Sequence, residues 1–182
     1  MFNFIFAILM YSVILDIWGE SYLPNKGNKI YVNELAYEMG FRNGDEILSF
    51  DDYIPEDFGM LQADLARQTA SKAKVLRYGD TVNIYIDHSM IGQVLNTPGM
   101  FDLALPFKVQ SVSETSPNAG LDVRKGDMVI TVAGEEVNYV QEAWPILEKH
   151  PGEEIAVAFL RDADTVTLDM AVDTTGRLGV LL

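Results

Sequence analysis

The sequence contains no cysteine and few basic residues, and both shortages exclude whole classes of function. Without cysteine, the chain can form no disulfide, no thiolate metal site and no cysteine nucleophile. Thirteen Lys and Arg residues face 27 Asp and Glu residues, so the 182-residue chain carries a formal net charge of −14. A chain of this charge repels phosphate backbones, and nucleic acid is therefore not an expected partner.

Histidine is almost as scarce, which limits both catalysis and metal binding. The two histidines, His88 and His150, are far apart in the sequence. The triplet Asp87-His88-Ser89 has the residue types of a catalytic triad, but adjacent residues cannot converge on one another as a triad does. The acidic pairs at 51–52 and 162–164 lack the spacing of a calcium loop. We therefore predict no catalytic residue, no metal ligand, no zinc binding and no peptidase activity for this chain alone.

Polar residues are also rare at the start of the chain, where residues 1–18 read MFNFIFAILMYSVILDIW. A helix of that length spans about 27 Å, close to the thickness of a bilayer core. The segment lacks the basic start and cleavage site of a signal peptide and the cationic face of a lipid-surface helix. The pattern predicts a transmembrane helix within residues 1–22, with membrane lipid as a partner. Because the apolar run starts at residue 1, the chain also has the character of a piece of a longer protein.

Beyond this segment the chain contains an internal repeat. A Gly-Asp pair followed by a short apolar run occurs at Gly44-Asp45 and again, 82 residues later, at Gly126-Asp127. An Arg-x-x-Asp-Thr-Val string begins at Arg77 and again, 84 residues later, at Arg161. Two landmarks at nearly equal offsets indicate a tandem duplication.

Each copy is predicted to be a small, mostly β unit with one main helix. The glycines at 44 and 126 can adopt the positive φ of a tight turn, and the β-branched residues that follow favour strands. Apolar residues at helical spacing predict a helix within about residues 55–72 and 139–150. The fold class is therefore α+β, mostly β.

The second copy carries a more specific signature. Ser116-Pro117-Asn118-Ala119-Gly120-Leu121, followed by Gly126-Asp127 and then Gly134, resembles the signature of bacterial PDZ domains. The first copy, in residues 36–45, is a degraded version. The resemblance implies two PDZ-like modules, each a small β-barrel or sandwich with one main helix, at residues 23–104 and 105–182.

The order of segments narrows the resemblance. A hydrophobic helix that contains Asn3 and leads into two PDZ modules is similar to the RseP-type intramembrane zinc metalloproteases of the site-2 protease family. In that family Asn3 matches the Asn of a Gly-Pro-x-x-Asn-type motif. The family's His-Glu-x-x-His zinc motif and its Asp-Gly ligand motif do not occur in this sequence. The resemblance therefore implies a central fragment of a protease, with no cofactor in this chain and zinc in the full-length enzyme.

This resemblance implies a regulatory role at the bacterial inner membrane. The PDZ pair would lie on the periplasmic side and filter the membrane-protein substrates or peptide segments that reach an active site held elsewhere. Two alternatives stay open at this point. One is a membrane-anchored PDZ scaffold without protease activity, and the other is the PDZ portion of an HtrA-type serine protease.

The candidate peptide-binding residues are Gly176, Arg177, Leu178, Gly179 and Val180. A glycine-containing loop with exposed N–H groups can receive a carboxylate, and the strand edge after it can accept a peptide by β-addition. The corresponding segment of the first copy, residues 97–103, matches less well. We expect a bulky residue at position 179 to block the loop while leaving the fold intact.

Overall fold

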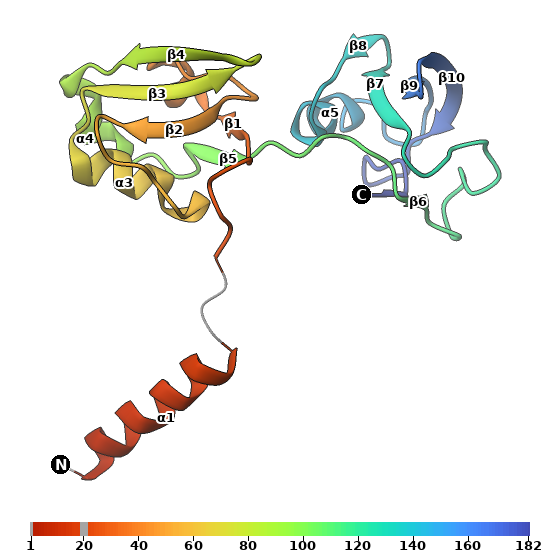
Figure 1. The fold of residues 1–182 in the computed structure, drawn as a ribbon. Coiled ribbons are helices and arrows are strands. Elements are labelled where there is room, and N and C mark those ends of the chain that lie inside the picture. The colour runs from red at the N-terminus through yellow and green to blue at the C-terminus, as the bar shows by residue number, and fades with distance from the viewer. Residues whose placement is uncertain (1, 19–21) are drawn as a thin grey trace. The chain divides into compact units, whose positions relative to one another are not determined.

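The computed structural model describes residues 2–18 and 22–182, and within the first helix the side chains of residues 3–13. The chain divides into two compact units, residues 1–102 (unit 1) and residues 103–182 (unit 2). Both units are shown as ribbons in Figure 1.

The first helix corrects the prediction of a transmembrane segment. Helix α1 spans Phe2–Trp18, and its 17 residues correspond to about 26 Å, short of the roughly 30 Å of a bilayer core. Within the described residues, no helix is long and apolar enough to cross a membrane. The transmembrane prediction for residues 1–22 is therefore wrong, and residues 1 and 19–21 of that range lie outside the described residues.

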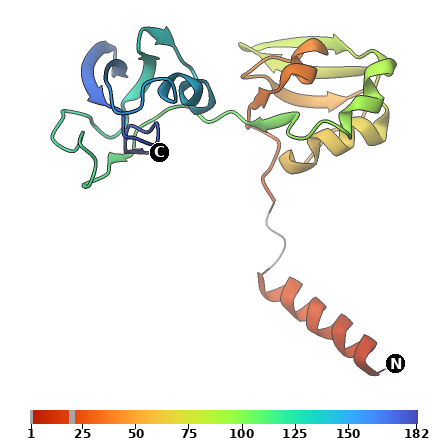
Figure 2. The same cartoon turned by 180° about the vertical axis from the view of Figure 1, so that it is seen from behind.

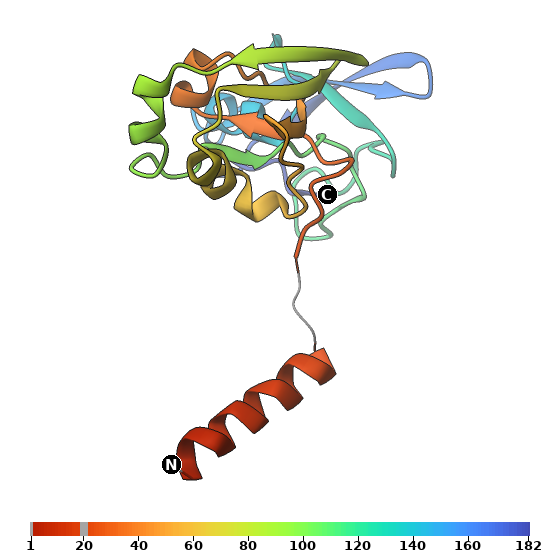
Figure 3. The ribbon, with the colours of Figure 1, turned by 60° about the vertical axis from the view of Figure 1, so that its left-hand side comes forward.

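Unit 1 contains a three-stranded antiparallel sheet, a two-stranded sheet and several short helices. The larger sheet has the order β2-β3-β4, and the smaller one pairs β1 with β5. Helices α3 and α4 contact each other, and α3 also contacts β2 (Figures 1 and 3). The elements are β1 (Ile30–Val32), α2 (Glu34–Glu38), β2 (Glu46–Phe50), η1 (Phe58–Met60), α3 (Leu61–Gln68), β3 (Lys72–Arg77), β4 (Asp80–Tyr85), α4 (His88–Val94) and β5 (Phe101–Leu103).

Unit 2 has the same plan with a longer hairpin. Its four-stranded antiparallel sheet has the order β10-β9-β7-β8, so β10 forms one edge (Figure 2), and a second sheet pairs β11 with β6. Helix α5 packs on β7, and the core of the unit contains Val129 of β7 and Val157 and Phe159 of β9, all fully buried or nearly so. The elements are β6 (Ser111–Val112), β7 (Met128–Val132), β8 (Glu135–Glu136), α5 (Val140–Leu147), β9 (Glu154–Arg161), β10 (Asp164–Ala171) and β11 (Val180–Leu181).

The two units share details of strand geometry, as expected for a duplicated fold. The strand after the Gly-Asp pair has a register irregularity at the same place, between Ile47 and Ser49 in β2 and between Val129 and Thr131 in β7. An irregularity of this kind bends the strand and increases its twist. Both sheets therefore curve at equivalent positions.

The repeated Gly-Asp and Arg-x-x-Asp-Thr-Val strings meet in space as an ion pair whose carboxylate is buried and whose guanidinium is half-buried. In unit 2 the Arg161 guanidinium donates to both carboxylate oxygens of Asp127, at 2.9 and 2.7 Å. In unit 1 Arg77 contacts Asp45 in the same two-pronged way, at 2.7 and 2.8 Å. Each carboxylate also accepts the N–H of the residue three positions before it, which closes the turn. The hydrogen bonds from Arg161 hold the pKa of Asp127 below its usual value.

Removing the aspartate is therefore predicted to destabilise either unit. Asp127→Ala leaves a guanidinium and a turn N–H without their partner, and the expected loss is about 3 kcal/mol of unfolding free energy. Asp45→Ala is expected to have the same effect in unit 1, because Asp45 is fully buried in the same geometry. Urea denaturation followed by circular dichroism measures both losses.

The matched control is Asp164→Ala, an exposed residue at the tip of the β9–β10 hairpin. Its unfolding midpoint should stay at the wild-type value. Equal midpoints for Asp127→Ala and Asp164→Ala would show that the buried pair does not stabilise the fold.

Candidate functional site

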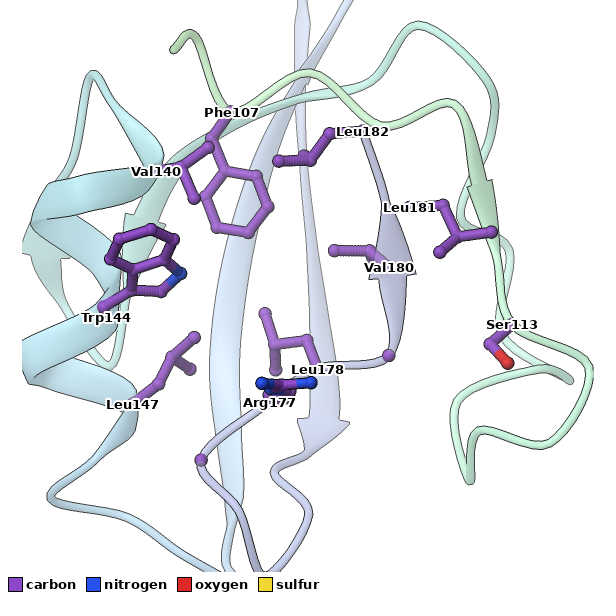
Figure 4. A pocket seen from close by; sticks show the side chains of 12 residues that line it. Phe107, Ser113, Val140, Trp144, Leu147, Arg177, Leu178, Val180, Leu181 and Leu182 are labelled. Atoms are coloured by element: carbon purple, nitrogen blue, oxygen red, sulfur yellow. The ribbon is translucent and has the colours of Figure 1, made fainter. Parts of the chain in front are cut away.

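A groove lies between helix α5 and strand β11 of unit 2. Its cavity volume is about 330 Å³, and its walls are mostly apolar. Figure 4 shows α5 on one side of this groove and β11 on the other, with β6 beyond β11. The lining residues are Phe107, Ser113, Val140, Trp144, Leu147 and the C-terminal segment 176–182.

The helical wall follows from the spacing of three apolar residues on α5. Val140, Trp144 and Leu147 are separated by four and three positions, which places them on one face of a helix. Val140 and Leu147 are buried, whereas the indole of Trp144 is 54% exposed. Trp144 therefore forms the open rim of the groove, and the other two form its floor.

The loop before β11 is held by an ionised side chain. One carboxylate oxygen of Asp173 accepts hydrogen bonds from the Thr175 N–H, the Thr175 hydroxyl and the Arg177 N–H, at 2.7, 2.7 and 2.9 Å. These bonds, the Thr175 side-chain bond first among them, lower the pKa of Asp173. The folded-state pKa is below the unfolded one, so this hold is complete at neutral pH and is lost as pH falls through the folded value.

Two consecutive carbonyl groups at the start of β11 point to the same side of the chain. The Leu178 carbonyl accepts hydrogen bonds from Ser116 Oγ at 3.2 Å and Asn118 Nδ2 at 2.9 Å. The Gly179 carbonyl accepts the Ser113 N–H at 2.8 Å. All three donors belong to the segment 113–118, so both carbonyls face that segment.

The N–H groups of Gly179 and Val180 must then face the opposite way. The described peptide bonds are all trans, and in a trans peptide the carbonyl and the next N–H point in opposite directions. The N–H groups that follow the two anchored carbonyls therefore point away from segment 113–118, toward the groove that Gly179 and Val180 line. Two successive N–H groups on one side form a concavity suited to an anion, and we call this pair the nest.

All five predicted site residues line the groove, in different roles. Gly176 is buried beside Glu148 with φ of 75°, and Leu178 belongs to the core of unit 2. Gly179 and Val180 supply the nest. The Arg177 side chain is exposed, and among the described residues it is the only charged side chain that lines the groove.

Several residues of the site were not predicted to belong to it from the sequence, although Ser116 and Asn118 were noted there as part of the PDZ signature. The residues that hold the loop, Ser113, Ser116, Asn118 and Asp173, are common turn residues, and nothing in their local sequence indicates a contact across the unit. The α5 residues carried a usable signal, because their spacing already predicted an apolar helix face within residues 139–150.

The described part of unit 1 has no equivalent nest. Asp102 occupies the position of Gly179 when the glycines at 99 and 176 are aligned, and it lacks the positive φ that Gly179 has. In addition, the Gln62 side chain on α3 donates to the Thr97 carbonyl at 2.8 Å and accepts the Met100 N–H at 3.2 Å. In unit 1 helix α3 therefore holds this loop through Gln62. Asp102, an acidic residue, lies at the position of Gly179 in unit 2.

The residues that could hold a metal are not brought together. Within the described residues, no three His, Asp or Glu side chains are grouped in a way that could bind a metal ion. His88 contacts Ser71, and His150 contacts Glu153. The described part of the chain therefore brings together no set of side chains that would hold zinc.

Comparisons with known proteins match part of this chain to a domain family and most of it to one curated protein. The family model of the PDZ domain matches residues 102–172. A curated protein of Neisseria meningitidis serogroup A, named "Putative zinc metalloprotease", is 25% identical over 201 aligned positions, which cover 98% of this chain and 44% of the relative. The chain thus spans less than half the length of that relative. The resemblance stated from the sequence is confirmed to this extent: a PDZ domain in a chain related to that protein.

Solved structures with similarity to this chain include three bacterial proteins. The PDZ domain of an SdrC-like protein from Listeria monocytogenes is 19% identical and covers 40% of this chain and 82% of its own, with a TM-score of 0.35. Its counterpart from Listeria innocua is 21% identical, with coverages of 42% and 91% and a TM-score of 0.37. A solution structure from Geobacillus thermodenitrificans is 24% identical, with coverages of 38% and 79% and a TM-score of 0.33.

The structure contradicts the expectation that a bulky residue at position 179 leaves the fold intact. Gly179 has φ of 68°, and a Cβ built on it would lie 2.4 Å from Ser116 Oγ. Gly179→Ala is therefore predicted to cost more than about 2 kcal/mol of unfolding free energy, from the left-handed backbone and the clash together. Chemical denaturation of the purified chain measures this cost.

Gly120→Ala is the control, because a Cβ there meets no atom within 4 Å and its backbone is not left-handed. It should leave stability nearly unchanged. Wild-type stability in Gly179→Ala would mean that position 179 tolerates a side chain after all.

Proposed function

We propose that unit 2 binds the free carboxyl terminus of an extended polypeptide whose last side chain is apolar. The observation that carries this proposal is the nest of Gly179 and Val180 at the end of an apolar groove. Backbone N–H groups bind a carboxylate through charge-assisted hydrogen bonds, which are stronger than bonds between neutral groups. A peptide carboxylate is the anion that arrives attached to an extended apolar chain.

The peptide would lie as an added strand between β11 and α5. Among the described strands, β11 pairs with β6 alone and on one side, and Val180 has its N–H directed to the other side. Main-chain hydrogen bonds to that open edge would supply affinity without regard to sequence. Specificity then depends on the side chains that enter the groove.

The last side chain of the peptide would enter the floor of the groove. Phe107, Leu147 and Leu178 belong to this floor and are buried. An apolar side chain placed against them leaves water, at roughly 25 cal/mol for each Å² of apolar surface removed. A charged last side chain would lose its hydration there without gaining a partner.

We further propose that this groove serves a zinc metalloprotease of which the chain is a part. The relatedness to the Neisseria protein supports that assignment, and the groove would then filter which polypeptides reach an active site elsewhere in the longer protein. The alternative is a peptide-binding scaffold without protease activity. The expected localisation, with both units on the periplasmic side of the bacterial inner membrane, stays a prediction.

Peptide titration tests the binding proposal. A labelled peptide that ends in Leu with a free carboxylate should bind at least tenfold more tightly than the same peptide with a C-terminal amide, because the amide loses about 1.5 kcal/mol or more of charge-assisted bonding. Fluorescence anisotropy measures both affinities. Equal affinities for acid and amide would show that the nest does not receive a carboxylate.

A substitution at Trp144 tests whether the groove takes part in proteolysis. Trp144→Ala removes one wall of the groove and is expected to weaken peptide binding about tenfold. In the full-length protein it should slow cleavage of a substrate that presents an apolar carboxyl terminus and leave a substrate without one unaffected. Tyr78→Ala, which removes a 95% exposed aromatic ring from unit 1, is the matched control.

The pattern of cleavage rates separates the two functional alternatives. Weaker peptide binding without any change in cleavage would support the scaffold and exclude the filter. Equal slowing of both substrates would indicate an effect on folding or catalysis and would also exclude the filter.

A further inference from the structure

We propose that Asn118, together with Ser116, is a positioning residue for the nest: it sets the direction of the Gly179 N–H by holding the preceding carbonyl. This inference rests on the proposed carboxylate-binding function of unit 2. Neither residue lines the groove. Their effect on a ligand would therefore pass entirely through the Leu178–Gly179 peptide plane.

The amide of Asn118 has only one orientation that suits its surroundings. Its Nδ2 donates to the Ala171 carbonyl at 2.8 Å and to the Leu178 carbonyl at 2.9 Å, and its Oδ1 accepts the Ala171 N–H at 2.9 Å. Both amide hydrogens are thus used. A flipped amide would place its oxygen against two carbonyl oxygens, so the side chain is locked.

This locked amide connects the loop to the most regular part of unit 2. Ala171 is the last residue of β10, which pairs with β9 along eight consecutive residues. Asn118 itself is 2% exposed, and its own N–H donates to Ser116 Oγ at 3.2 Å. Asn118 therefore fixes the Leu178 carbonyl relative to the sheet that contains β9 and β10.

Ser116 completes the hold on the same carbonyl. Its hydroxyl donates to the Leu178 carbonyl from a second direction, so this carbonyl has two donors. It also lies so close to Gly179 that no Cβ fits between them. The two donors fix the peptide plane, and a fixed plane presents its N–H to a ligand without first losing conformational freedom.

Comparison of the two units indicates that this arrangement is not needed for the fold itself. When Gly40 and Gly120 are aligned, unit 1 has Ala36 in place of Ser116 and an exposed Glu38 in place of Asn118. It also has Asp102 in place of Gly179. Unit 1 nevertheless forms the same bent strand and the same buried ion pair. The two donors and the nest therefore occur together in unit 2 and are absent together from the described part of unit 1.

The test is the ratio of affinities for the free-acid and amidated forms of the Leu-terminated peptide. Asn118→Ala and Ser116→Ala should lower this ratio from at least about tenfold to below about threefold, by weakening binding of the acid alone. Binding of the amidated peptide, which uses only the groove and the strand edge, should stay within about twofold of wild type. A residue with a merely structural role would weaken both peptides equally or lower only the melting temperature.

Asn25→Ala is the matched control. Asn25 is a buried asparagine of unit 1 whose Nδ2 donates to the carbonyls of Ile47 and Pro55, so its loss has a similar structural cost away from the groove. Its acid-to-amide ratio should equal that of wild type. If Asn118→Ala does not fold, as judged by circular dichroism, Ser116→Ala decides the question.

The outcomes separate the inference from the proposal on which it rests. A wild-type chain that binds acid and amide equally rejects the carboxylate site and the inference with it. A wild-type chain that prefers the acid, with folded Asn118→Ala and Ser116→Ala variants that prefer it just as strongly, overturns the positioning role and leaves the proposed function standing.

Discussion

The left-handed backbone at Gly179 is the constraint on which the groove of unit 2 depends, because it lets two consecutive carbonyls face the same side of the chain. In a regular strand, successive carbonyls alternate between neighbours. Here the carbonyls of Leu178 and Gly179 are both bonded to segment 113–118, and φ at Gly179 is 68°. The opposite side is left with two N–H groups in succession. A side chain at position 179 would prevent this arrangement, because its Cβ would clash with Ser116.

The two units have the same fold but differ in the loop before the last strand. Both units keep the buried Arg–Asp pair, the closed Gly-Asp turn and the irregular strand. The loop before the last strand contributes no residue to these features, so its sequence can differ between the units. In unit 1 it is bonded to Gln62, and in unit 2 it is bonded to Asp173 and Asn118. The stable part of each unit therefore does not determine whether a nest forms.

The sequence predicted those parts of the fold and of the site that depend on short sequence patterns. The paired landmarks at 44–45 and 126–127 mark real turns, and residues 176–180 do line a groove. The predicted transmembrane helix was wrong because the apolar run ends at Trp18, and the helix that it forms among the described residues is too short to cross a membrane. The expectation for Gly179 was wrong because Ser116, 63 positions earlier, fills the space beside it. Contacts between distant segments carry no signature in a single sequence, and for that reason the contact of Asn118 with the Leu178 carbonyl was not predicted, although Asn118 was noted as part of the PDZ signature.

The charge of the chain makes backbone N–H groups a suitable means of binding a carboxylate. With a net charge of −14, the protein as a whole repels an acidic ligand. That repulsion is screened beyond about 8–10 Å at physiological salt, whereas hydrogen bonds act at contact distance. A nest offers directed donors without any side chain that neighbouring acids could neutralise. Arg177, whose charged side chain lies on the groove wall, adds a positive charge beside those donors. A ligand with one terminal carboxylate and an apolar last side chain gains these contacts, whereas a ligand rich in acidic side chains would meet the repulsion of the whole surface.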